Sequence, residues 1–145
     1  AINPMGKVPA VVHDGQVITE VAAIITYLAD AFPQAALIPS NRAAFYRWMF
    51  FGAGPIEAAV TNAALAVEVP PERSGMVGYG SLKAVLNTLE AQLLKAPYIC
   101  GDAFSAADVY VGSQIGYGIA LRLGLPEHNV NQLVAIAVLT DGGAR

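Results

Sequence analysis

Charged residues are scarce in this sequence, and its basic residues do not cluster. Only 13% of the 145 residues are Asp, Glu, Lys or Arg and 55% are hydrophobic, whereas an average globular protein carries roughly 25% charged residues. The formal net charge is −3, so we do not expect a nucleic-acid partner. The low charge instead predicts large buried faces, some of which could form a subunit interface.

Long apolar runs, paired cysteines and metal-ligand clusters are also missing. The longest uncharged stretches, such as residues 109–121, are about 13 residues, short of the roughly 18 that span a bilayer, so we expect no membrane segment. The single cysteine, Cys100, cannot form an internal disulfide, which favours the reducing cytoplasm. His13 and His128 have no partners at metal-ligand spacing, so we expect no metal site.

The first 33 residues predict a small α/β element. Two short apolar runs, residues 8–12 and 17–18, flank an Asp14-Gly15 pair, which is a strong signal for a two-residue hairpin turn. From Glu20 onward, apolar residues at positions i, i+3, i+4 and i+7 predict an amphipathic helix. We expect Pro33 to end that helix.

After a linker at residues 34–41, the rest of the sequence predicts helices. Residues 43–67 form one long helical segment, which we expect Gly52–Pro55 to kink or break. Residues 45–51 are apolar on nearly every face, which predicts burial between layers or subunits. Farther along, Ser105 and Asp108 have the spacing of a capping box at the start of a helix.

Two short motifs carry candidate binding chemistry, and the first is Lys7-Val8-Pro9. A cis peptide bond between Val8 and Pro9 would turn the Val8 backbone N–H and C=O away from the strand ladder. A backbone pair exposed in this way can bind another peptide as an added strand would. The alternative is an ordinary trans proline at the start of a strand.

The second motif is Thr19-Glu20-Val21, at the predicted start of the first helix. A helix N-terminus offers free backbone N–H groups to a carboxylate, and Glu20 beside it could pair with an ammonium group. The motif therefore suits the α-amino acid end of a ligand. The alternative is that Thr19 is simply the N-cap and Glu20 a first-turn acid.

Taken together, the two motifs are similar to the bacterial cytosolic glutathione transferases over residues 3–33. The pattern is Asn-Pro-x-Gly-Lys-Val-Pro, followed by Thr-Glu and by Ala-Ala-Ile-x-x-Tyr-Leu-Ala-Asp, and the resemblance continues in Phe-Ser-Ala-Ala-Asp at residues 104–108. It implies part of a thioredoxin-like α/β glutathione-binding domain at residues 1–33. After the linker at 34–41, it implies an all-helical domain at residues 42–145.

The resemblance also implies roles for residues of the two motifs. Val8, held by Pro9, would supply the backbone pair for the cysteinyl part of glutathione. Glu20 would contact the γ-glutamyl end, and Lys7 would lie near the glycyl carboxylate. Val21 departs from the family, which usually has Ser or Thr at this position. Losing that hydroxyl removes one hydrogen bond to a charged group, worth about 1.5–3 kcal/mol.

The family's thiol-activating Ser, Tyr or Cys has no counterpart in the sequence, so we expect it upstream of Ala1. Cys100 lies in a turn, where we expect a buried structural cysteine. The resemblance implies an enzyme in which glutathione thiolate attacks a small apolar electrophile lying against residues 45–51. It also implies a homodimer. A non-catalytic binding or structural module on the same fold is the alternative, and residues 1–145 alone are expected to show little activity.

Overall fold

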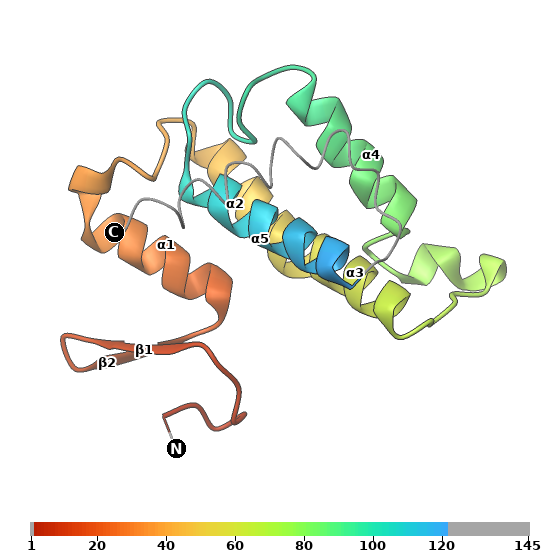
Figure 1. The fold of residues 1–145 in the computed structure, drawn as a ribbon, viewed down its shortest axis with the longest axis horizontal. Helices are drawn as coiled ribbons and strands as arrows, with labels where there is room; N and C mark the ends of the chain where they lie inside the picture. The colour runs from red at the N-terminus through yellow and green to blue at the C-terminus, as the bar shows by residue number, and fades with distance from the viewer. Residues whose placement is uncertain (1, 122–145) are drawn as a thin grey trace.

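The protein begins with a β-hairpin that leads into a helical body. The computed structural model describes residues 2–121 (Figure 1). Strand β1 (Ala10–His13) pairs antiparallel with β2 (Gln16–Thr19). The turn residues Asp14 and Gly15 both have positive φ angles, as a two-residue type I′ hairpin turn requires. The predicted hairpin is confirmed: β1 begins and ends slightly later than the first apolar run, and β2 extends the second run by one residue at each end.

Helix α1 (Val21–Ala31) follows β2 directly and packs against α5. It ends before Pro33, which begins a short 3₁₀ turn, η1 (Pro33–Ala35). The N-cap position is Glu20, whose side chain makes no capping hydrogen bond. The alternative in which Thr19 caps this helix is therefore wrong, since Thr19 is the last residue of β2.

The expected kink in the long helical segment takes the form of a π-helical turn. Helix α2 (Arg42–Phe51) passes through η2 (Gly52–Ile56) into α3 (Glu57–Ala64) without a break. Pro55 lies inside η2. A π turn inserts one extra residue, so it accommodates a proline that cannot donate a hydrogen bond. The helical path ends at Ala64, three residues earlier than the sequence predicted.

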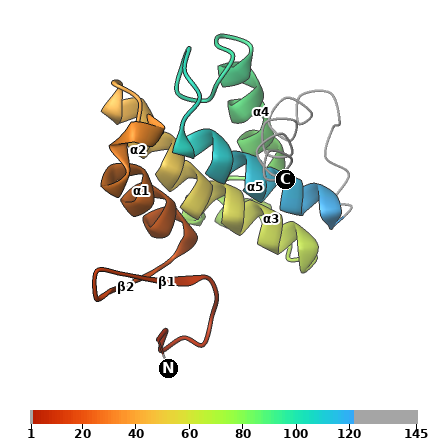
Figure 2. The same ribbon diagram turned by 60° about the vertical axis from the view of Figure 1, so that its left-hand side comes forward.

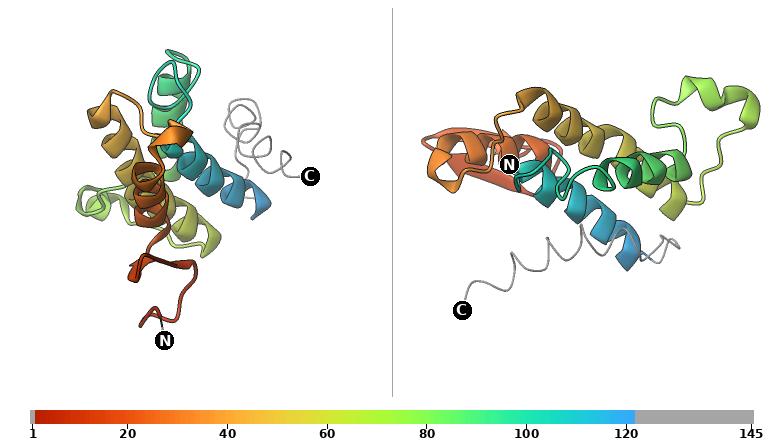
Figure 3. Two further views of the ribbon diagram at one scale, coloured as in Figure 1. Left: turned by 90° about the vertical axis from the view of Figure 1, so that its left-hand side faces the viewer. Right: turned by 90° about the horizontal axis from the view of Figure 1, so that it is seen from above.

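Helix α5 (Ala106–Ala120) forms the centre of the helical body. It packs against α1, α2, η2 and α3, while α4 (Leu82–Leu93) packs against α3 and η2. Figures 2 and 3 show α1, α2 and α3 arranged around α5, with the hairpin outside the helical layer. A further 3₁₀ segment, η3 (Pro71–Met76), precedes α4. No helix within residues 2–121 is long and apolar enough to cross a membrane.

A buried polar turn fixes the start of α5. One Asp108 carboxylate oxygen accepts from the Ser105 N–H at 2.9 Å and from the Ser105 hydroxyl at 2.7 Å. The other accepts from the Ile99 N–H at 2.7 Å. Both Ser105 and Asp108 are fully buried, and the hydrogen bond from the Ser105 N–H to the Asp108 carboxylate confirms the predicted capping box. The neighbouring Cys100 is also buried, as predicted, and burial raises the pKa of its thiol above the ordinary value of 9.0.

Candidate functional site

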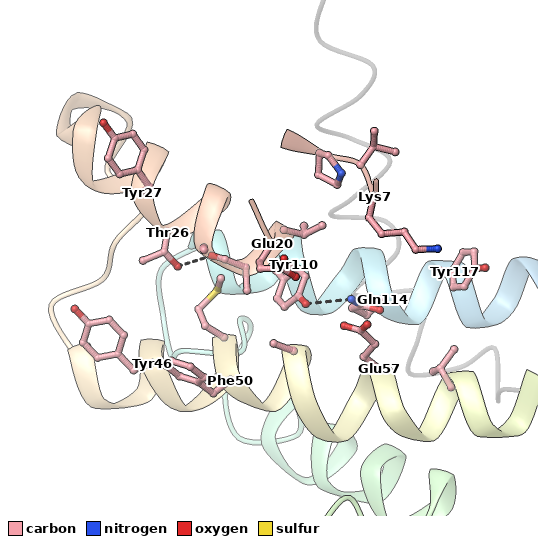
Figure 4. Close-up of a pocket in the computed structure, with 18 of the residues that line it drawn as sticks. Lys7, Glu20, Thr26, Tyr27, Tyr46, Phe50, Glu57, Tyr110, Gln114 and Tyr117 are labelled. Carbon is pink, nitrogen blue, oxygen red and sulfur yellow. Dashed lines mark hydrogen bonds between the residues drawn. The ribbon is translucent and has the colours of Figure 1, made fainter. Parts of the chain in front are cut away.

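A cavity of about 1060 Å³ lies between the N-terminal element and the helical body. The loop before β1 and the first turns of α1 form one wall. The helical path α2–η2–α3 and the middle of α5 form the opposite wall (Figure 4). The structure brings together in this cavity all the residues predicted to bind a ligand: Lys7, Val8, Pro9, Glu20 and Val21.

Asn3 shapes the loop that carries the first motif. Its side-chain amide donates to the carbonyl of Lys7 at 2.9 Å, and its side-chain oxygen accepts from the Met5 N–H at 2.9 Å. The side chain is almost buried, and Gly6 adopts the positive φ that closes this tight turn. Because Asn3 bonds to the carbonyl of Lys7, the loop is held in one conformation just before Val8.

Val8 presents an unpaired stretch of backbone to the cavity. The Val8–Pro9 bond is cis, so the alternative of an ordinary trans proline is wrong. Val8 precedes β1 and is 91% exposed. Within residues 2–121, neither its N–H nor its C=O makes a hydrogen bond. This N–H and C=O pair is therefore free to bind the backbone of an extended ligand.

Glu20 is held in an unusual backbone conformation at the start of α1. Its φ and ψ angles are 68° and 120°, a region that costs a non-glycine residue about 1–3 kcal/mol. Among the described residues, its carboxylate has no hydrogen-bond or ion-pair partner. The next three residues, 21–23, also line the cavity, and the N–H groups of a first helical turn have no partner within the helix. Strain and unpaired polar groups thus coincide at one point of the cavity wall.

The opposite wall is aromatic and apolar. Tyr46 and Phe50 of α2 line it together with Met49 and Val60. Tyr46 is 49% exposed and Phe50 is 73% exposed, whereas Phe45 and Trp48 on the same helix are buried in the core. The predicted burial between layers is thus confirmed for the face that carries Phe45 and Trp48, whereas burial against a second subunit stays a prediction. This helix has one face in the core and another in the cavity.

A polar group that the sequence did not predict lies within this apolar wall. The Gln114 side-chain amide donates to the Tyr110 hydroxyl at 3.2 Å, and Glu57 lines the cavity beside them (Figure 4). Burial raises the pKa of the Tyr110 phenol. The hydrogen bond from Gln114 acts in the opposite direction, and the negative charges of Glu57 and Glu20 raise the pKa further. Tyr110 is therefore a neutral phenol at physiological pH.

Gly52 allows Tyr110 to take this position. A Cβ atom at Gly52 would lie 2.8 Å from two carbon atoms of the Tyr110 ring, so only glycine fits in this turn of η2. The glycine-rich run at residues 52–54 was the signal available in the sequence. It indicated an irregular helix there, but it could not indicate which side chain packs against it.

His13 does not line this cavity. The Nδ1 atom of His13 lies 3.0 Å from the Tyr27 hydroxyl, and His128 lies outside the described residues. Residues 2–121 contain no cluster of three His, Cys, Asp or Glu side chains that could hold a metal ion. Cys100 lies in the buried turn before α5 and does not line the cavity.

The two walls suit two chemically different ligand parts. The N-terminal wall offers a backbone pair, a helix N-terminus, the carboxylates of Glu20 and Asp30 and the ammonium group of Lys7, which together match a zwitterionic peptide. The helical wall offers aromatic surface with one polar group, which matches a small apolar molecule. Both lie on one cavity, so a peptide and a small molecule can be held side by side.

Comparison with known proteins gives the same result in both halves of the chain. The sequence model of the glutathione S-transferase N-terminal domain matches residues 1–36, and that of the C-terminal domain matches residues 41–117. Glutathione S-transferase GstA of Escherichia coli O157:H7 is 32% identical over 130 residues, covering 86% of this chain and 64% of the relative. Glutathione S-transferase GST-4.5 of Xanthomonas campestris is 28% identical, over 76% of this chain and 58% of the relative. The chain thus spans about three-fifths of the length of these curated relatives.

Solved structures agree. A ternary complex of BphK, a bacterial glutathione S-transferase, superposes with a TM-score of 0.72 at 27% identity, covering 97% of this chain and 71% of that one. A sphingomonad glutathione S-transferase complexed with glutathione gives a TM-score of 0.66 at 27% identity, with the same coverage. The predicted fold is confirmed: part of a thioredoxin-like α/β domain followed by a helical domain. The chain belongs to the glutathione S-transferase family.

Proposed function

We propose that the protein is a glutathione transferase, which joins the glutathione thiolate to a small electrophile. The observation that carries the proposal is that the Val8 backbone pair, Glu20 and Lys7 line the same cavity as an aromatic wall. The related sphingomonad enzyme has been solved with glutathione bound, which supports glutathione as the peptide ligand. The proposal includes a division into residues 1–33, a linker at 34–41 and a helical domain at 42–145.

Each part of glutathione has a matching group in the cavity. The Val8 N–H and C=O pair with the backbone of the cysteinyl residue as a short added strand. Glu20 accepts from the γ-glutamyl ammonium, and the first N–H groups of α1 receive the neighbouring carboxylate. Lys7 pairs with the glycyl carboxylate. Val21 contributes only its backbone N–H, so this carboxylate has one hydrogen bond fewer than a Ser or Thr would give it.

The reaction is a nucleophilic attack. The bound thiolate forms a carbon–sulfur bond to the electrophile, and a leaving group departs or an added electron pair is protonated. Binding both reactants in one cavity converts a bimolecular encounter into an effectively unimolecular step. Lowering the thiol pKa needs a hydrogen-bond donor at the sulfur. In keeping with the resemblance, we assign that donor to a segment upstream of Ala1.

The aromatic wall supports a small apolar electrophile as the second substrate. Tyr46 and Phe50 present exposed ring surface to the cavity, and such surface favours aromatic or aliphatic molecules without requiring a particular one. The proposal also places the protein in the cytoplasm as a homodimer that detoxifies electrophiles. A chain with 55% hydrophobic and 13% charged residues supports a buried subunit interface.

Val21 favours a second candidate, a non-catalytic glutathione-binding or structural module on the same fold. Retention on immobilised glutathione, followed by a conjugation assay with chlorodinitrobenzene, separates the two candidates. Retention with turnover supports the transferase, and retention without turnover supports the module. A protein that is not retained contradicts the transferase and the glutathione-binding module, and leaves only the structural module.

The assignment of Glu20 is tested by Glu20→Ala. Removing this acceptor of a charge-assisted hydrogen bond lowers glutathione affinity by about 10- to 150-fold, which corresponds to about 1.5–3 kcal/mol. The measurement is isothermal titration calorimetry. Glu72→Ala is the matched control, because Glu72 is exposed in η3 and does not line the cavity. An unchanged affinity in Glu20→Ala would show that the assignment is wrong.

A further inference from the structure

The charged side chains of the cavity are unevenly distributed between its two walls. Within the described residues, four charged side chains line it: Lys7, Glu20, Asp30 and Glu57. The proposed function uses Lys7 and Glu20 for glutathione. Asp30 is near the end of α1 and belongs to the N-terminal wall. Glu57, at the start of α3, is the charged side chain that lines the aromatic wall among the described residues.

Glu57 extends from α3 toward Gln114 on α5 (Figure 4). Within residues 2–121, its carboxylate has no hydrogen bond and no ion pair. The polar neighbours, the Tyr110 phenol and the Gln114 amide, are both uncharged. Nothing in the described cavity wall on this side therefore offsets the negative charge.

We propose that Glu57 selects the second substrate by charge, so that neutral or cationic electrophiles are accepted and anionic ones are disfavoured. The inference rests on the proposed function, because it assigns the aromatic wall to the electrophile. Glu57 is a specificity-determining residue in it and takes no part in bond formation.

Bound glutathione strengthens this selection. Its glycyl carboxylate offsets Lys7, and its ammonium group offsets Glu20. The γ-glutamyl carboxylate, and before the reaction the thiolate, then add negative charge to the cavity that already holds Glu57 and Asp30. An anionic electrophile meets net repulsion, whereas a cationic one is attracted. Glu57 is largely solvent-exposed, so screening limits the effect to about threefold to fivefold per charge.

The test uses binding of reaction products, so that it does not depend on turnover. Three S-aryl glutathione conjugates share the tripeptide and a nitrophenyl ring and differ in one substituent: a carboxylate, a carboxamide or a trimethylammoniomethyl group. Their dissociation constants and that of glutathione itself are measured by calorimetry on the natural protein. In 20 mM salt, the cationic conjugate should bind about tenfold more tightly than the anionic one. In 0.5 M salt, this ratio should approach one.

Variants then assign the preference to one side chain. Glu57→Gln should lower the ratio to about threefold or less, and Glu57→Lys should invert it. Neither change should alter the affinity for unmodified glutathione by more than about twofold. Glu72→Gln removes the same charge outside the cavity and should leave the ratio unchanged. The melting temperature of each variant verifies that it is folded.

Three outcomes overturn the inference while leaving the proposed function intact. One is a wild-type ratio of one or less. Another is that Glu57→Gln leaves the ratio of cationic to anionic conjugate affinity unchanged, or that Glu72→Gln lowers this ratio as much as Glu57→Gln does. The third is that Glu57→Gln weakens glutathione and all three conjugates equally, because Glu57 would then belong to the tripeptide part. A protein that binds none of the four ligands overturns the proposed function and this inference together.

Discussion

Two polar regions of the molecule differ in how their hydrogen-bonding groups are satisfied. In the turn before α5, the buried carboxylate of Asp108 accepts three hydrogen bonds from Ser105 and Ile99. At the cavity edge, the Val8 backbone and the Glu20 carboxylate have no partner within residues 2–121. Glu20 is also held at a φ of 68°.

The difference separates a structural role from a binding role. A buried polar group must be paired because leaving it unpaired costs about 1–3 kcal/mol. An exposed polar group at a cavity is hydrated in the free protein, so it can remain unpaired until a ligand binds. A strained backbone there indicates that the surrounding structure fixes the conformation of that residue. We therefore expect changes in the turn to affect stability alone. Changes at Val8 or Glu20 should affect ligand binding and leave stability unchanged or improved.

The largest effect is expected from Asp108→Ala. This change leaves the N–H groups of Ile99 and Ser105 and the Ser105 hydroxyl without their acceptor in the core. At about 1–3 kcal/mol for each buried unpaired group, we expect a loss of about 3–5 kcal/mol, measured by urea unfolding. Asp108→Asn retains one acceptor and should lose less. If Asp108→Ala lost under 1 kcal/mol, the turn would not have the structural role described here.

Gly52→Ala should affect both the core and the cavity, because Gly52 packs against Tyr110. The new methyl group would lie 2.8 Å from the ring of Tyr110, which is buried and cannot move freely. Overpacking of this kind costs about 1–3 kcal/mol, and shifting the ring should weaken aryl-conjugate binding more than glutathione binding.

Gly54→Ala is the matched control for Gly52→Ala, because a Cβ atom there meets nothing within 4 Å. A helical glycine replaced by alanine in open space should gain about 0.5–1 kcal/mol. Thermal unfolding measures the change in stability of each variant, and calorimetry measures its affinity for the aryl conjugates and for glutathione. Equal behaviour of the two variants would contradict the contact between Gly52 and Tyr110.

The features that the sequence predicted are local ones. The Asp14-Gly15 turn, the helix that ends before Pro33 and the Ser105/Asp108 capping box each depend on residues a few positions apart. The cavity edge was predictable for another reason. Lys7-Val8-Pro9 and Thr19-Glu20-Val21 form a family pattern, and every residue of the two motifs except Thr19 lines one cavity.

The helical wall could not be predicted because it depends on packing between distant segments. The sequence indicated an irregular helix at Pro55, but a π turn rather than a break follows from how η2 fits against α5. Tyr110, Gln114 and Glu57 come from two helices, and no sequence pattern links them. The apolar composition of residues 45–51 predicted burial between layers or subunits, but composition alone does not separate the core face of α2 from its cavity face.

Val21→Ser tests whether the cavity edge has a missing hydrogen bond. A serine hydroxyl at the start of α1 can donate to the γ-glutamyl carboxylate, so we expect glutathione affinity to rise about tenfold, or about 1.5 kcal/mol. Val21 also packs against the core, so Val21→Ala is the control that removes the same apolar contact without adding a hydroxyl. Calorimetry should show that Val21→Ser binds glutathione more tightly than Val21→Ala does. Equal affinities would mean that this position does not face the carboxylate.

Glu20→Gly is the most direct test of strain at the cavity edge, and its expected effect on stability is small. Glycine adopts a φ of 68° without steric cost, so the variant should gain about 1 kcal/mol in urea unfolding, even though glycine makes the unfolded chain more flexible. Glutathione affinity should fall at the same time, because the carboxylate is gone.

Ala66→Gly is the control for Glu20→Gly. Ala66 has a φ of 52° and does not line the cavity, so relief of strain there should raise stability and leave binding unchanged. If Glu20→Gly instead lost stability, the unliganded protein would depend on the Glu20 carboxylate, and the contrast between the cavity edge and the buried turn would be wrong.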